Sequence, residues 1–156
     1  MYGFIIVGRI NSLRNNALDL NNHHVDFDWL KGRSCTKVQA PDEWTTVFEV
    51  GDAALSVQTL WRVSLQGQLR LTSADHGQVY GLASPINATT AAHELLVGRE
   101  ISAVHADLAR GDLLIHLGLD CLLEIITDSH YEPWQLTGPG RNYVAAADGR
   151  IHDLRA

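Results

Sequence analysis

The sequence predicts a mainly β protein, in which two tandem β-meander repeats pack as a sandwich or a partly closed barrel with pseudo-two-fold symmetry. Three observations predict this fold class: a set of residues that recurs along the chain, apolar and polar residues that alternate with a period of two, and glycines placed between the alternating runs. The chain has 156 residues, of which 46% are hydrophobic and 19% charged, so it is long enough and apolar enough for one domain with a buried core.

The repeat is carried by two groups of residues at different offsets. Leu30-Lys31-Gly32-Arg33 recurs as Leu96-Val97-Gly98-Arg99, and further on Trp61 recurs as Trp134 at an offset that is larger by seven residues. Loops absorb such insertions at little entropic cost, so the change of offset is compatible with one repeated fold. We expect a single domain with an N-terminal extension (1–24), a first copy (25–81), a linker (82–88) and a second copy (89–156).

Each copy is expected to form four or five strands joined by hairpins. The strands of the first copy are predicted near residues 34–39, 45–50, 54–58, 61–65 and 68–72, and those of the second near 101–106, 113–117, 121–127, 134–137 and 143–146. Helix is expected to be minor: Thr89-Thr90 resembles an N-cap before helix-forming residues 91–96, and residues 12–19 are a weaker candidate. Residues 1–24 are expected to add a strand or form an arm.

Composition argues against several classes of function. The net charge is −6, and the few Lys and Arg residues are scattered, whereas nucleic acids and anionic membranes are bound by clustered positive charge. No apolar run reaches the length of a membrane span or a signal-peptide core, so a cytoplasmic location is expected. The two cysteines, Cys35 and Cys121, lie in apolar stretches and are expected to be buried free thiols, and no cofactor is expected.

Two polar segments contain residue types found in catalytic sites. Asp75 beside His76 could supply a carboxylate and a base, but neighbours in an extended segment point in opposite directions, and Asp148-Gly149 takes the same place in the second copy without a histidine. A turn cap is therefore the favoured interpretation of Asp75. The run Ser129-His130-Tyr131-Glu132 also fails as a catalytic triad, because such groups converge from separate segments.

The histidines raise a metal hypothesis. In a strand, His24, Asp26 and Asp28 would project to one side as possible ligands, but a solvated loop or edge with polar residues facing water is the favoured interpretation. His76 and His130 could instead line a ligand site between the copies. His105 and His116 are expected to face outward, and no metal site is assigned.

The order of motifs between residues 29 and 150 resembles a group of small uncharacterised bacterial proteins with two β repeats. The motifs are a Leu-x-Gly opening, Trp61-Arg62, the segment 72–78 with Asp-His-Gly-Gln followed by Gly81-Leu82, and Asp128-Ser129 followed by Tyr-Glu-x-Trp at 131–134. In size and style these proteins resemble immunity-like members of bacterial toxin and antitoxin systems. That resemblance implies an acidic binding module without catalytic residues.

The leading hypothesis is a non-enzymatic protein-binding module that sequesters a toxin or another basic partner. The predicted contact residues are Tyr131, Glu132, Trp134, Trp61, Arg62, Asp75 and His76. Trp61 and Trp134 have an alternative structural role, since equivalent positions of the two copies would most simply plug the core of each half. The alternative function is a small-ligand or metal-binding β domain, and an unpaired edge strand would allow a homodimer.

Overall fold

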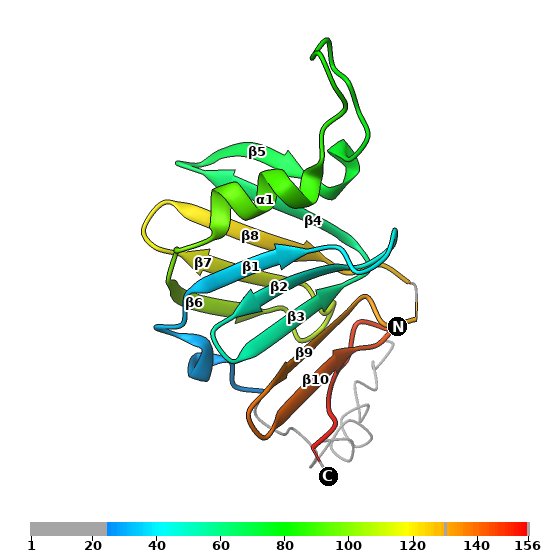
Figure 1. Cartoon of the computed structure of the whole chain (residues 1–156). Coiled ribbons are helices and arrows are strands. Elements are labelled where there is room, and N and C mark those ends of the chain that lie inside the picture. Colours follow the sequence, from blue (N-terminus) through cyan, green and yellow to red (C-terminus); the bar gives the residue numbers. More distant parts are fainter. Residues whose placement is uncertain (1–24, 130, 156) are drawn as a thin grey trace, which may run out of the picture.

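The computed structural model describes residues 25–129 and 131–155, which form two antiparallel sheets packed face to face (Figure 1). Across the six-stranded sheet the order is β1 (Cys35–Gln39), β2 (Thr46–Val50), β3 (Ala53–Val57), β9 (Trp134–Gly138), β10 (Arg141–Ala145) and β11 (Ile151–Asp153). Across the five-stranded sheet it is β5 (Gln68–Thr72), β4 (Leu60–Leu65), β8 (Cys121–Ile126), β7 (Leu113–Leu117) and β6 (Ile101–Ala106). The predicted mainly β sandwich is confirmed, and its sheets do not close into a barrel.

Each sheet combines strands from both copies of the repeat. β1, β2 and β3 of the first copy continue across the sheet into β9 and β10 of the second, while β6, β7 and β8 of the second continue into β4 and β5 of the first. The expected uninterrupted meander is therefore broken between β3 and β4, where the chain crosses to the opposite sheet. This exchange pairs the open edge that a three-stranded meander would leave at β3 and at β8.

Equivalent residues of the two copies make equivalent contacts. Trp61 lies opposite Ile125 across the β4–β8 ladder, and Trp134 lies opposite Val57 across the β9–β3 ladder. Where the copies meet, an isolated antiparallel bridge joins Ser34 to Glu100. The pseudo-two-fold relation predicted from sequence is thus visible in strand register.

The arginine of the repeated motif anchors a hairpin turn in each copy. Arg33 Nη1 lies 3.1 Å from Asp52 Oδ1 in the β2–β3 turn, and Arg99 Nη1 lies 3.0 Å from Asp120 Oδ1 in the β7–β8 turn. The arginine of the repeated motif therefore has a structural role, which is to hold a hairpin turn in each copy.

One helix, α1 (Ala88–Leu96), covers the outer edge of β1. The backbone N–H of Val38 in that strand donates to His93 Nδ1 at 3.2 Å, so the edge is partly capped by a side chain. The N-cap is Asn87, whose side chain accepts from the N–H of Thr90. The expected cap at Thr89-Thr90 is wrong by two residues, and the candidate helix at 12–19 lies outside the described residues. No helix among the described residues is long and apolar enough to span a membrane.

Both cysteines are buried free thiols, as predicted. Burial raises the pKa of Cys35 to about 11 and also raises the pKa of Cys121. Since the thiolate is the reactive form, we expect a thiol reagent at about pH 8 to label the native protein far more slowly than the unfolded chain. Absorbance of a released aromatic thiol measures the rate, and rapid labelling of either cysteine without denaturant would contradict the buried placement.

Candidate functional site

A cleft of about 480 Å³ opens at one end of the sandwich, among loops of the first copy. Its walls come from the β1–β2 loop, the two-residue β3–β4 connection, the 3-10 turn η2 (Ser73–Asp75) and the beginning of α1. The lining is mixed: Trp44 and Trp61 supply aromatic surface, while Ser73 and His76 supply polar groups. A space of this size is typical of ligand and side-chain binding sites.

The β1–β2 loop holds Trp44 at the rim of the cleft. Asp42 accepts hydrogen bonds from the backbone N–H of Trp44 at 2.8 Å and of Thr45 at 2.7 Å, and these bonds lower the pKa of its carboxyl group. Trp44 is 77% exposed. The loop thus has a defined conformation and presents an indole to solvent.

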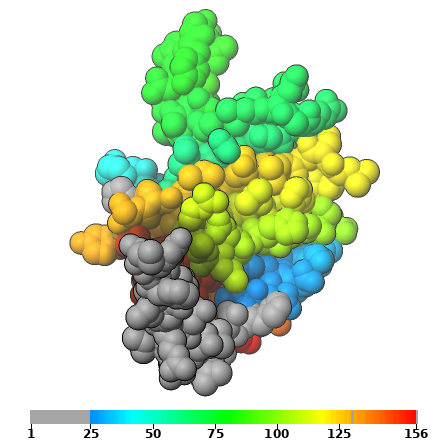
Figure 2. All heavy atoms as spheres, turned by 180° about the vertical axis from the view of Figure 1, so that it is seen from behind, coloured from blue at the N-terminus to red at the C-terminus, as the bar shows by residue number. Residues whose placement is uncertain are grey.

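Residues 76–87, here called the finger, rise beside the cleft and stand clear of the body of the protein (Figures 1 and 2). Gly77 N–H donates to the carbonyl of Ile86 and Ile86 N–H donates to the carbonyl of Gln78, both at 2.8 Å, so the two arms are paired. At the tip, Tyr80 has a backbone φ of +44°, a value that residues other than glycine rarely adopt. Its hydroxyl donates to Asp75 at 3.2 Å, and this bond raises the pKa of Tyr80.

The Asp-His-Gly-Gln motif forms the base of the finger. Asp75 Oδ2 accepts from the backbone N–H of Thr72 at 2.8 Å in a reciprocal capping box, and His76 Nδ1 accepts from the backbone N–H of Ala88 at 3.2 Å. Asp75 and His76 therefore bond to different partners. The motif fastens the finger to η2 and to α1.

The equivalent end of the second copy is closed. There the chain turns tightly at Asp148-Gly149 into β11, and the backbone of Gly149 packs against Arg110 in the β6–β7 loop so closely that a Cβ on Gly149 would lie 2.8 Å from the Arg110 carbonyl oxygen. Trp134 Nε1 also donates to the carbonyl of Gly111 at 2.8 Å in the same loop. The two copies thus differ at one position of the repeat, where the first has a cleft and a finger.

The loop between β8 and β9 carries Tyr131 and Glu132 and lies next to the cleft. The backbone N–H of Gln58 donates to the carbonyl of Pro133 at 2.8 Å, and Thr59 Oγ1 donates to Asp128 Oδ2 at 3.0 Å. Both predicted contact residues are exposed, Tyr131 by 93%. Figure 2 shows this loop (orange) and the β1–β2 loop (cyan) on the same side of the molecule.

Three predicted contact residues have structural partners. Trp61 and Trp134 are 1% and 0% exposed and fill the core of the two halves, and Trp61 is also among the residues that line the cleft. Arg62 pairs with Glu124 through two bonds of 2.6 and 3.0 Å, and this carboxylate raises the pKa of the guanidinium group. Asp75, His76, Tyr131 and Glu132 are the predicted residues that surround the open end.

Among the described residues, no group of three or more His, Cys, Asp or Glu side chains is placed to hold a metal ion. In the segment where a strand was considered, Asp28 begins the 3-10 turn η1 (Asp28–Leu30) and pairs with Lys31 at 2.8 Å, while Asp26 accepts from the backbone N–H of Asp28. His24 and His130, the partners proposed for a metal or ligand site, lie outside the described residues. His105 is exposed and His116 half-buried, with ring centroids 5.5 Å apart.

The loops of the open end are acidic. The segments 40–45, 58–59, 73–87 and 127–133 contain no Lys or Arg, and their carboxylates are Asp42, Glu43, Asp75, Asp128 and Glu132. Such a surface attracts a basic partner and repels an acidic one.

Sequence reasoning missed Trp44, Tyr80 and Leu82 as candidate contact residues. The finger was assigned partly to the first copy and partly to a linker, because its paired backbone is short. Two signals were available: Tyr80-Gly81 is a turn dipeptide between apolar residues, and Pro41-Asp42 marks a fixed loop before Trp44.

Comparison with known proteins gives a family but no activity. The model of a family of unknown function matches residues 28–155. No curated protein and no solved structure matches the chain.

Proposed function

The chain belongs to the DUF6188 family, and because the description of that family names no activity, we propose from the geometry that the protein is a non-enzymatic protein-binding module. The observation that carries the proposal is the difference between the copies: the first has an open cleft and a projecting finger where the second is closed by backbone contact. The cleft and finger are the proposed contact surface.

The tip of the finger has the properties of a binding anchor. Val79, Tyr80 and Leu82 are all exposed, Tyr80 by 69%, although the backbone around them is hydrogen-bonded. Apolar side chains held in a fixed loop lose little conformational entropy when a partner covers them, and aromatic residues often dominate the energy of an interface.

A basic partner fits the charge of this end. The loops that carry the exposed rings of Trp44, Tyr80 and Tyr131 contain carboxylates and no Lys or Arg, which favours contact of these rings with cationic side chains of a partner. The likeness in style to immunity proteins agrees with this chemistry, and we extend the proposal to sequestration of a toxin or a similar basic protein.

The proposal is tested by site-specific photo-crosslinking in the cells that make the protein. A photoreactive phenylalanine at Tyr80 or Trp44 is expected to capture one protein, whereas the same residue at Leu119, fully exposed in the β7–β8 turn, is expected to capture none. Mass spectrometry of the adduct names the partner.

Variants then measure the contribution of the finger. The double variant Tyr80→Ser, Leu82→Ser is expected to weaken binding to that purified partner by about tenfold or more, and Leu119→Ser to leave it unchanged. The proposed contact surface would be wrong if the probe at Leu119 captured the partner as well as the probe at Tyr80 or Trp44 did, or if the double variant bound the partner with unchanged affinity.

A small ligand in the cleft is the second candidate. The volume of about 480 Å³ and the polar groups of Ser73 and His76 favour it. Native mass spectrometry separates the candidates, because a ligand adds a small mass and a partner adds that of a polypeptide. A small adduct lost from a Trp44→Ala variant would place this function first.

A further inference from the structure

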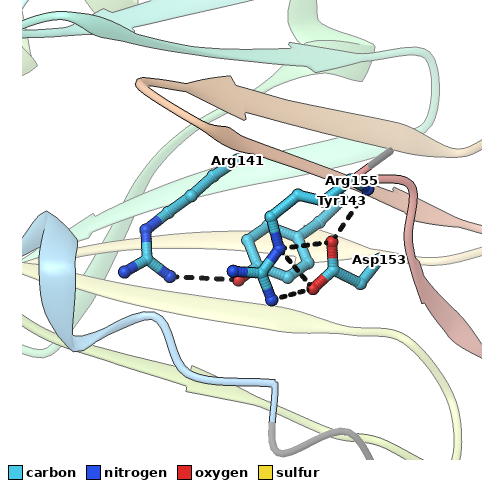
Figure 3. Close-up of polar contacts among 4 residues, drawn as sticks. All are labelled: Arg141, Tyr143, Asp153 and Arg155. Carbon is cyan, nitrogen blue, oxygen red and sulfur yellow. Dashed lines mark hydrogen bonds and ion pairs between the residues drawn. The ribbon is translucent and has the colours of Figure 1, made fainter.

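A group of arginine and aromatic side chains lies at the other end of the strands from the cleft, and we call Trp29, Arg33, Arg141, Tyr143 and Arg155 the arginine cluster. The Cζ atoms of Arg33 and Arg141 lie 5.2 and 5.3 Å from the ring centroid of Trp29. Arg141 Nη1 donates to the hydroxyl of Tyr143 at 3.3 Å, and Arg155 Cζ lies 6.0 Å from the Tyr143 ring. Figure 3 shows the guanidinium groups of Arg141 and Arg155 turned toward Tyr143.

One of the three arginines in the arginine cluster has no carboxylate partner among the described residues. Arg33 pairs with Asp52 and Arg155 with Asp153, but no carboxylate of the described residues pairs with Arg141. Arg141 is half-buried. A partly desolvated charge without a counter-ion is unfavourable, so this position calls for an anion.

The other half-buried arginines of the described chain follow a different rule. Arg62 pairs with Glu124 and Arg99 with Asp120, just as Arg33 pairs with Asp52. Arg141 is the exception among them.

The same cluster contains unused hydrogen-bond donors. Three buried side-chain N or O atoms of the described residues lack a partner, and two of them are Trp29 Nε1 and Arg33 Nε. Buried donors without acceptors are rare in folded proteins, and both contribute positive potential beside Arg141. The Tyr143 hydroxyl, which accepts from Arg141, keeps its own proton to donate.

We propose that the arginine cluster binds an oxyanion, a carboxylate or a phosphate group, held by the guanidinium of Arg141 with the Tyr143 hydroxyl as a second donor. A planar guanidinium matches either group through two parallel bonds, which a lysine ammonium does not. The site lies apart from the cleft and the finger and does not depend on the proposed function.

The test is isothermal titration of the full chain with inorganic phosphate and with acetate, at constant ionic strength set by chloride. Saturable binding of either ion is expected, and Arg141→Gln is expected to weaken it by about tenfold or more. The matched control is Arg70→Gln, which removes one exposed cation from β5 and is expected to leave binding unchanged. Tighter binding of phosphate identifies a phosphate site, and tighter binding of acetate a carboxylate site.

A second measurement guards against loss of folding. In a chloride buffer without phosphate or carboxylate, Arg141→Gln is expected to melt at or above the temperature of the parent, because an uncompensated charge has been removed, and added phosphate or acetate is expected to raise the melting temperature of the parent alone. The proposal is overturned if the parent binds neither ion saturably, if Arg70→Gln weakens binding as much as Arg141→Gln, or if Arg141→Gln is the less stable protein without anion.

Discussion

Replacement of Trp134 by alanine is expected to lower the free energy of unfolding by about 3–5 kcal/mol, the range measured when large aromatic residues are truncated in protein cores. The side chain is fully buried, contacts Phe27 edge to face with ring centroids 6.4 Å apart, and donates its indole N–H to Gly111. The variant loses the packing and leaves a buried carbonyl without its donor. Urea denaturation followed by far-ultraviolet circular dichroism measures the loss.

Two variants serve as controls for Trp134→Ala. Trp44→Ala removes the same side chain from an exposed site and is expected to change stability by less than about 0.5 kcal/mol. Trp134→Phe keeps most of the packing but not the hydrogen bond, and is expected to lose about 1–3 kcal/mol. If Trp44→Ala were as damaging as Trp134→Ala, the assignment of Trp134 to the core and Trp44 to the rim would be wrong.

Replacement of Gly149 by alanine is expected to cost about 2–4 kcal/mol, because two unfavourable effects add. Its φ of +83° disfavours any Cβ, and the new methyl group would lie 2.8 Å from the carbonyl carbon and oxygen of Arg110. The β10–β11 turn must then move away from the β6–β7 loop. Thermal and urea denaturation measure the cost.

Gly140→Ala is the matched control for Gly149→Ala. Gly140 also has a positive φ, of +64°, but no atom lies within 4 Å of a Cβ built there, so only the conformational cost of about 1–2 kcal/mol is expected. The difference between the variants isolates the contact that closes the second copy. Equal losses would mean that this contact contributes nothing to stability.

The strands and the repeat were predictable because their signals are local. Alternation predicts the buried faces of β7 and β8, and the constant order of Leu-x-Gly-Arg and Trp by itself indicates two copies. Strand β11 was missed because its three residues are too few for a pattern. The helix was predicted, but a preceding asparagine competed for the cap.

The exchange of strands and both candidate sites were not predictable in the same way. The residues of 54–57 alone do not predict that β3 pairs with β9, because pairing between distant strands depends on which faces the whole chain can bury. The finger depends on bonds between Gly77, Gln78 and Ile86, and the arginine cluster joins residues from 29 to 155. Only the acidic character of the open end could be read from composition.

The exchanged strands fix the order in which the sheets can be completed while the chain is being synthesised. All five strands of the sheet that contains β4 and β8 precede residue 127, whereas β3 must wait for β9, which begins at Trp134. A nascent chain that has just emerged to residue 127 can therefore hold one complete sheet, while β3 remains an open edge until β9, residues 134–138, has left the ribosome. A pause in translation within this interval would expose β3 to pairing with another chain.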